Sequence, residues 1–256
     1  MLLAVDIGNT NITIGIYKED SLILVLRAAT DRAKTPDQYA VELSSMLHIH
    51  NADGFSFKGA IISSVVPELT SAIKDAIKTV TGQTALLIGP GVKTGLNIRI
   101  DNPAQLGADL VAGAVGALGK YELPCLVLDM GTANKISVLD SKGNYRGCTI
   151  SAGVKISLNA LSSGTSQLPA IPLEAPHSAI GTNTIDSMQS GTVLGAAAMI
   201  EGLCARLEED LGEEVKTIVA TGGISGDIIR YCRLNIIHDP DLILDGLKFI
   251  FNKNTI

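Results

Sequence analysis

The sequence has no tryptophan, and aromatic residues fill only 4% of its 256 positions. Charged residues are also sparse, at 18%, whereas hydrophobic residues reach 46% and are mostly Ala, Val, Ile and Leu. Small and branched side chains of this kind suit closely packed layers of helices and sheets. A chain of this length can bury a large core and is long enough for two compact domains.

Basic residues are few as well: 20 Lys and Arg stand against 26 Asp and Glu, which gives a net charge of −6. This balance argues against nucleic acid or an anionic membrane as the main partner, because both are bound through basic surface. A phosphate-bearing ligand would therefore have to be held by backbone N–H groups, helix ends and metal ions.

Cysteine is scarce, and the four that occur include no C-x-x-C pair, so free thiols in a reducing cytoplasm are expected. Long apolar runs are absent too, since none reaches the roughly 18 residues that span a bilayer without a charge or a turn-forming residue. The first residues lack the basic flank of a signal peptide. We therefore predict a cytoplasmic protein without a membrane segment.

An acid–glycine turn joins two predicted strands near the start of the chain. Leu2–Ile7 is a short apolar run that ends in the sequence D-I-G-N-T. After it, Ile12, Ile14 and Ile16 alternate with polar or small residues, which is typical of a half-buried strand.

The same pattern returns in the second half, where an apolar strand ends in D-M-G-T-A-N. Aligning Asp6 with Asp129 also aligns Gly8 with Gly131 and Asn11 with Asn134. A second similarity joins residues 61–66 and residues 218–223, and each of these segments precedes a predicted helix. Two such similarities in one chain indicate an internal duplication.

The duplication predicts two mixed α/β domains, residues 1–118 and 119–256, that face each other across a central cleft. The boundary is expected near residues 116–123, at the end of a helix that starts around Gln105. Ligands commonly bind in such clefts of open α/β sheets.

Each acid–glycine turn offers free N–H groups that can hold a polyphosphate, because glycine lets the backbone approach closely. The carboxylates would hold Mg²⁺ or a monovalent cation, since they repel phosphate. The alternative is that a D-x-G sequence forms only a hairpin turn. A third glycine segment, Gly222-Gly223, fits an adenine or ribose site, or else a simple strand-to-helix turn.

Asp109 is the acidic residue of an otherwise apolar predicted helix. It is either a structural acid stabilised by the helix dipole or a general base that accepts a proton from a substrate hydroxyl.

Taken together, these segments resemble the type III pantothenate kinases, a family of the acetate and sugar kinase, Hsp70 and actin superfamily. The resemblance runs in family order through nearly the whole chain. The matching segments are Asp6-Ile7-Gly8-Asn9-Thr10-Asn11, Ile62-Ser63-Ser64-Val65-Val66-Pro67, Asn102-Pro103, Gly107-Ala108-Asp109, Asp129-Met130-Gly131-Thr132-Ala133, Leu168-Pro169, Ile180-Gly181-Thr182-Asn183-Thr184, Ser187-Met188-Gln189-Ser190-Gly191 and Ala220-Thr221-Gly222-Gly223.

The resemblance implies two ribonuclease H-like domains, as in the duplicated actin and sugar-kinase fold, and ATP-dependent phosphorylation of pantothenate in coenzyme A synthesis. Asp109 would be the catalytic base in a homodimer. Asp129 would bind a monovalent cation, K⁺ or NH₄⁺, and Asp6 would bind Mg²⁺, directly or through water. Pantothenate would contact Gly107, Ala108, Asp109, Leu110, Thr184 and Ile100. The residues expected at ATP are Asp6, Ile7, Gly8, Asn9, Thr10, Asn11, Ile12, Thr13, Thr132, Gly222 and Gly223.

Three departures from the family pattern involve four residues. Leu110 replaces an Arg, Ile100 replaces a Tyr, and Asn134-Lys135 replaces a Thr-Thr pair. One hypothesis is that the Lys135 ammonium takes over part of the monovalent cation's role. The departures leave two other functions open: a diverged paralogue that uses another hydroxyl substrate or only senses nucleotide, and a sugar kinase or polyphosphate phosphatase of the same superfamily.

Overall fold

The structure, a computed structural model, describes residues 1–255 of the 256-residue chain. The chain divides into two compact units. Unit 1 comprises Met1–Leu96, Asn102–Gly119 and the chain from Leu242 onward. Unit 2 comprises Asn97–Asp101 and Lys120–Asp241.

Unit 1 is built on a five-stranded sheet with the order β3-β2-β1-β4-β5. The central strand β1 pairs antiparallel with β2 and parallel with β4. Because β1 is covered on both faces, it reads in the sequence as a continuous apolar run. The strands are β1 (Leu2–Ile7), β2 (Asn11–Lys18), β3 (Ser21–Ala29), β4 (Gly59–Ser64) and β5 (Leu86–Leu87).

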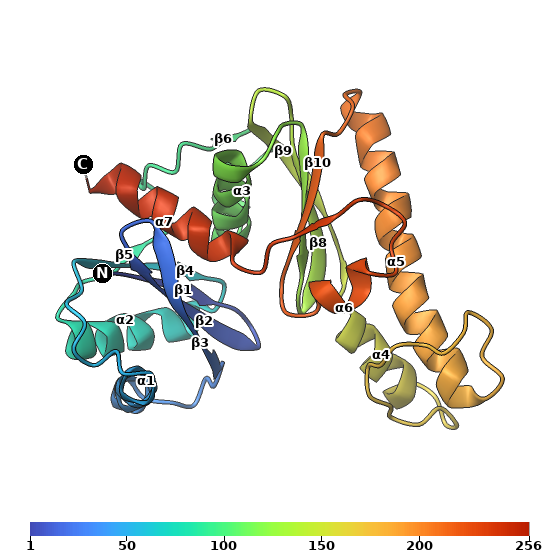
Figure 1. Cartoon of the computed structure of the whole chain (residues 1–256), viewed down its shortest axis with the longest axis horizontal. Coiled ribbons are helices and arrows are strands. Elements are labelled where there is room, and N and C mark those ends of the chain that lie inside the picture. The colour runs from blue at the N-terminus through green and yellow to red at the C-terminus, as the bar shows by residue number, and fades with distance from the viewer. Residues whose placement is uncertain (256) are drawn as a thin grey trace. The chain divides into compact units, whose positions relative to one another are not determined.

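Helices α1 (Pro36–Ile49) and α2 (Pro67–Thr81) cover one face of this sheet. Thr35 and Gln38 form a capping box that starts α1, so two N–H groups at the helix start are satisfied by side chains. Leu43 of α1 and Ile77 of α2 share one buried core with β1 residues. Figure 1 shows α7 on the other side of the same sheet.

The other face is covered by the C-terminal helix α7 (Leu242–Asn254). Glycines at the contacts leave the room that this helix needs. A Cβ on Gly15 of β2 would lie 2.9 Å from a methyl carbon of Leu244 in α7. Next to α7 lies α3 (Ala108–Lys120), and a Cβ on Gly246 would lie 2.7 Å from the Ala112 carbonyl carbon and 2.9 Å from the Gly116 nitrogen. The two helices therefore touch through their backbones.

The α3–α7 contact gives a stability prediction. Gly246→Ala should lower the free energy of unfolding by about 1–3 kcal/mol, because the added methyl group overpacks the contact. Gly202→Ala is the matched control, since this helical glycine has no atom within 4 Å of the Cβ position. The control should gain up to about 1 kcal/mol from helix propensity. Denaturant unfolding measures the free energy of unfolding of both variants. An equal gain in stability in the two would contradict the close contact between α3 and α7.

Unit 2 has a six-stranded sheet with the order β11-β10-β7-β8-β9-β6. Strands β9-β8-β7-β10-β11 repeat the order of β3-β2-β1-β4-β5, with β6 added at one edge. This repetition confirms the predicted pair of ribonuclease H-like domains. The strands are β6 (Asn97–Ile98), β7 (Cys125–Met130), β8 (Ala133–Leu139), β9 (Asn144–Ala152), β10 (Thr217–Thr221) and β11 (Ile237–His238).

Unit 2 also contains the helices α4 (Val154–Ser163), α5 (Thr184–Leu211) and α6 (Ser225–Ile229). Asn183 caps α5, because its side-chain oxygen accepts the Asp186 N–H at 2.9 Å. Residues of α5 and α6 share a buried core with β7. Among the described residues, no helix is long and apolar enough to cross a membrane.

The pairing of the strands shows that the two alignments between the halves of the chain, made from the sequence, are each displaced by one residue in part. In unit 1 Asp6 pairs with Thr13, whereas in unit 2 Asp129 pairs with Lys135. The second turn is thus one residue shorter, so Asn134 does not correspond to Asn11. In the second alignment, Ser63 lies opposite Asp6 and Thr221 lies opposite Asp129. Ser63 therefore corresponds to Thr221, whereas the sequence alignment matches it with Ala220.

The units also differ from the predicted domain ranges in two segments. The chain passes from unit 1 to unit 2 after Gly119, but Asn97–Asp101 belongs to unit 2 and α7 belongs to unit 1. The helix expected around Gln105 is α3, which starts at Ala108 after a short 3₁₀ turn, η1 (Pro103–Gln105).

Candidate functional site

The first acid–glycine turn follows β1 at the carboxyl end of the strand. The Gly8 N–H donates to the Asn11 carbonyl at 3.0 Å, which closes the turn. Thr30, just after β3, holds it from the side: its hydroxyl donates to the Gly8 carbonyl at 2.7 Å and its N–H to the Thr10 carbonyl at 2.9 Å. Asn9, Thr10 and Asn11 remain exposed, so this fixed turn is accessible to a ligand.

Two neighbours of this turn were not expected to be site residues. Ser63 is fully buried, and its hydroxyl has no hydrogen-bond partner among the described residues. Arg32 reaches the turn from the loop after β3, with its Nη2 3.3 Å from Asn9 Oδ1. The resemblance already included Ser63, but no local pattern points to Arg32.

Asp109 is the second residue of α3 and is 9% exposed. Its Oδ1 accepts the Leu110 N–H at 2.8 Å, and its carboxylate lies in the first helical turn, where the dipole favours negative charge. Gly107 leaves room for it, because a Cβ there would lie 2.6 Å from Asp109 Oδ1. The carboxylate is thus held in one place by the start of the helix.

The second turn lies between β7 and β8 and is held by two glycines. The Gly153 N–H donates to the Thr132 carbonyl at 3.1 Å. Gly222 has a φ of +95° and lies against the backbone of Met130, where a Cβ would come within 2.7 Å of the Met130 nitrogen. Thr132 is exposed at the tip of the turn. Position 222 therefore supports the turn and requires glycine.

An ion pair lies at the base of the second turn. The Lys135 Nζ is 2.8 Å from Asp129 Oδ2, and the two side chains are 19% and 15% exposed. Because Asp129 and Lys135 are directly opposite in the β7–β8 ladder, their side chains project from the same face of the sheet.

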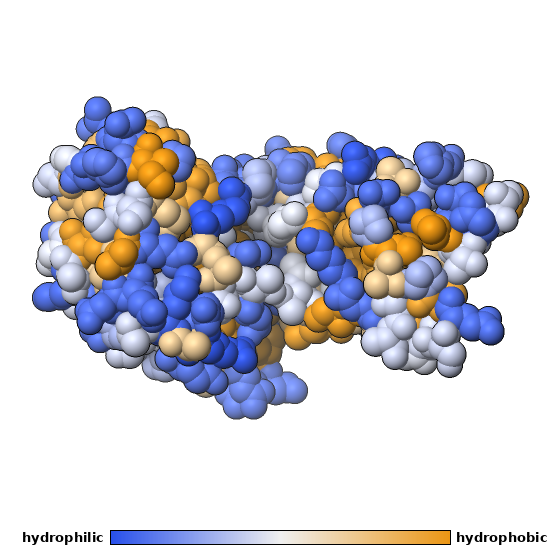
Figure 2. All heavy atoms as spheres, turned by 90° about the horizontal axis from the view of Figure 1, so that it is seen from below, coloured by the Kyte–Doolittle hydropathy of each residue, from blue (hydrophilic) through white to orange (hydrophobic). Residues whose placement is uncertain are grey.

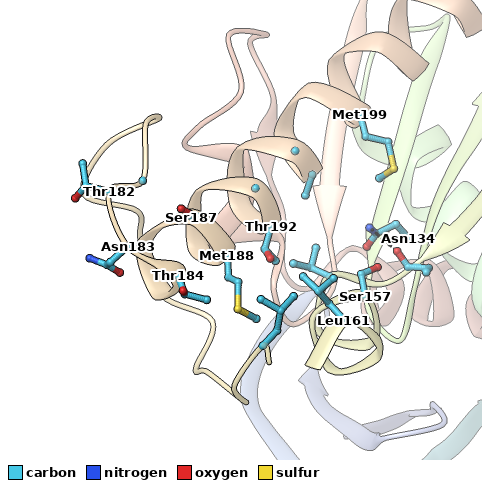
Figure 3. A pocket seen from close by; sticks show the side chains of 17 residues that line it. Asn134, Ser157, Leu161, Thr182, Asn183, Thr184, Ser187, Met188, Thr192 and Met199 are labelled. Carbon is cyan, nitrogen blue, oxygen red and sulfur yellow. Dashed lines mark hydrogen bonds between the residues drawn. The ribbon is translucent and has the colours of Figure 1, made fainter. Parts of the chain in front are cut away.

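Unit 2 also contains a cavity of about 890 Å³ between α4, α5 and the segment before α5. Figure 3 shows Met188, Thr192 and Leu161 gathered within it. Asn134, at one end, is 5% exposed; its Nδ2 donates to the Ala152 carbonyl at 3.3 Å, whereas its Oδ1 has no hydrogen-bond partner among the described residues. Thr184, an expected substrate residue, lines the same cavity.

The other expected substrate residues are divided between the units. Gly107, Ala108 and Leu110 belong to unit 1, at the start of α3, and Leu110 is partly exposed. Ile100 belongs to unit 2 and follows β6. Ile100 is not among the residues that line the cavity containing Thr184.

The structure describes all four cysteines, and each is a free thiol. Burial raises the pKa of Cys125 and of Cys204 to about 12, so both thiols stay protonated near neutral pH. Protonated, buried thiols are poor nucleophiles, and this argues against cysteine chemistry at these two positions.

Known proteins resemble this chain in both sequence and fold. A family model described as type III pantothenate kinase matches residues 2–206. The type III pantothenate kinase of Exiguobacterium sibiricum is 39% identical over 254 residues, covering 99% of this chain and all of that protein.

Among solved structures, the activator of 2-hydroxyisocaproyl-CoA dehydratase from Clostridium difficile, with bound ADPNP, matches with a TM-score of 0.58 and 12% identity, over 100% of this chain and 97% of that one. The ROK hexokinase of Thermus thermophilus matches with a TM-score of 0.50 and 12% identity, over 99% of both chains. These two likenesses show the fold. The sequence matches show more: the chain belongs to the type III pantothenate kinase family.

Proposed function

We propose that this protein transfers the γ-phosphoryl group of ATP to the primary hydroxyl of pantothenate, giving 4′-phosphopantothenate, in the first step of coenzyme A synthesis. The observation that carries the proposal is the family match over residues 2–206, with full-length relatives that bear the same name. The buried carboxylate of Asp109, held at the start of α3, supplies a proton acceptor of the kind that this reaction needs.

ATP phosphates are bound by the acid–glycine turns. The first turn uses its backbone N–H groups and the side chains of residues 6–13, with Asp6 holding Mg²⁺ directly or through water. One carboxylate together with phosphate oxygens and waters is a common Mg²⁺ donor set, and the half-buried Asp6 at the end of β1 fits it. Thr132, Gly222 and Gly223 of unit 2 complete the ATP contacts.

Asp109 acts as the general base. Its carboxylate accepts the proton of the pantothenate hydroxyl while that oxygen bonds to the γ-phosphorus and the bond from phosphorus to the ADP oxygen breaks. Phosphoryl transfer depends mainly on position and charge, so a carboxylate fixed by the helix start suits the role. Mg²⁺, when bound, would neutralise charge that develops on the phosphate oxygens.

Pantothenate is bound around the start of α3, by Gly107, Ala108 and Leu110, together with Ile100 and Thr184. Leu110 stands where the family has an Arg, so this chain lacks one charge-assisted bond at that position. Such a bond is worth about 1.5–3 kcal/mol, and weaker pantothenate binding than in relatives with the Arg is expected.

Thr184→Val should raise the KM for pantothenate about two- to tenfold with kcat nearly unchanged, because it removes one neutral hydrogen bond. Thr165→Val is the control, since Thr165 is exposed in the same unit and does not line the cavity. Steady-state kinetics of both variants would decide, and equal KM values in the two would remove Thr184 from the substrate site.

The protein acts as a homodimer in the cytoplasm, and Thr184 reaches pantothenate across the dimer interface. Exposed apolar side chains near the start of α5 support an interface there: Ile156, Leu161, Ile180 and Ile185 are 41–79% exposed. Figure 2 shows apolar residues interspersed with hydrophilic ones on the face that it draws. Light scattering at micromolar concentration would test this, and a monomer mass would contradict the dimer.

A second candidate function is a diverged paralogue that binds nucleotide but uses another hydroxyl substrate or none. Leu110 and Ile100 favour it, because both replace polar family residues expected at pantothenate. Calorimetry of pantothenate binding, with and without ATP, separates the two functions. Tight binding that ATP strengthens supports the kinase, whereas no binding at millimolar pantothenate supports the paralogue.

A further inference from the structure

The carboxylate of the second turn already has a cation beside it. Lys135 Nζ lies 2.8 Å from Asp129 Oδ2, and both side chains are more than four-fifths buried. The ladder sets this pair, because positions 129 and 135 are directly opposite on antiparallel strands. A shielded ion pair with a fixed backbone geometry is screened by salt much less than a surface pair.

The first turn provides an internal comparison. There, the residue opposite Asp6 is Thr13, which is neutral. The strand registers make Thr13 the counterpart of Lys135. A lysine at this place is therefore not a requirement of the fold, since one copy of the repeat forms the same hairpin without it.

A monovalent cation at Asp129 does not fit this arrangement. K⁺ or NH₄⁺ would have to share the carboxylate with the Lys135 ammonium, and two cations at one carboxylate repel each other. Displacing Lys135 would require moving a largely buried charge away from its partner. The residues present thus supply the positive charge themselves.

We propose that Lys135 is a positioning residue whose ammonium replaces the monovalent cation at Asp129, so that this protein binds MgATP without K⁺ or NH₄⁺. The proposal rests on the proposed function, because it assigns the second turn to ATP phosphates. The ammonium cancels the Asp129 charge that would otherwise repel the nucleotide, and it keeps the carboxylate in place beneath Thr132.

The test is calorimetry of MgATP binding to the full chain, without pantothenate, in potassium chloride and in tetramethylammonium chloride of equal ionic strength. The Kd of the wild-type protein should agree within about twofold between the two salts. Lys135→Met should bind MgATP about ten- to a hundredfold more weakly in tetramethylammonium, the worth of one charge-assisted interaction, and should recover part of that loss in K⁺.

Two variants serve as controls. Lys135→Arg should keep salt-independent binding, because it keeps the charge. Lys216→Met removes a lysine from the exposed Lys216–Glu214 pair of the same unit and should bind like wild type in both salts. Recovery by K⁺ in Lys135→Met alone distinguishes a charge role from a merely structural one.

A wild-type Kd at least about tenfold lower in K⁺ would overturn the proposal, and this comparison needs no variant. Wild-type affinity of Lys135→Met in tetramethylammonium would overturn it as well. A complete lack of MgATP binding in either salt would instead contradict the proposed function itself, and with it this assignment.

Discussion

Asp109→Asn should lower kcat for pantothenate phosphorylation by about 10²–10⁴-fold, the usual contribution of a general base. The amide oxygen of asparagine can still accept the Leu110 N–H, so the start of α3 and the fold should persist. MgATP binding should stay near the wild-type value, because the change removes only the group that accepts the substrate proton. ADP release and calorimetry measure the two quantities separately.

The matched control for this prediction is Asp75→Asn. Asp75 lies on the exposed side of α2 in the same unit, so the variant removes an equal charge away from the start of α3. It should keep wild-type kcat. Full activity in Asp109→Asn would show that Asp109 is only a structural acid at the helix start.

Gly222→Ala should lower kcat/KM for ATP by about a hundredfold. The added Cβ would come within 2.7 Å of the Met130 nitrogen, so the end of β7 and the second turn must shift. Displacing a positioning element by about 1 Å commonly costs about that factor in rate. Steady-state kinetics with ATP as the varied substrate measure the loss.

Gly212→Ala is the control for backbone strain. Gly212 also has a left-handed φ, +69°, but no atom lies within 4 Å of its Cβ position. The variant should lose about 1–2 kcal/mol of stability from the φ penalty and keep its kcat/KM for ATP. Similar kinetics in the two variants would mean that Gly222 does not support the phosphate site.

The duplicated fold could be predicted because its signal is local and occurs twice. Each apolar run followed by D-x-G contains its own strand and turn, and the two sheets repeat one strand order. The register could not be predicted in the same way. Matching Asn11 with Asn134 equates identical letters, but the turn hydrogen bonds make the second hairpin one residue shorter.

The placement of α7 was beyond sequence reasoning for a different reason. It depends on glycines distant in the chain, such as Gly15 and Gly116, which leave room for α7 residues. No local pattern relates these positions. The same holds for Arg32 beside Asn9 and for the buried amide of Asn134, whose surroundings come from long-range packing.

The central claim is that the γ-phosphoryl group of ATP passes to pantothenate. Its most direct test is an assay of the wild-type chain with ATP, Mg²⁺ and pantothenate that measures ADP release together with the mass of the product. We expect one ADP for each molecule of a product that is one phosphoryl group heavier than pantothenate. ADP release that is independent of pantothenate, or faster with sugars or polyphosphate, would contradict it.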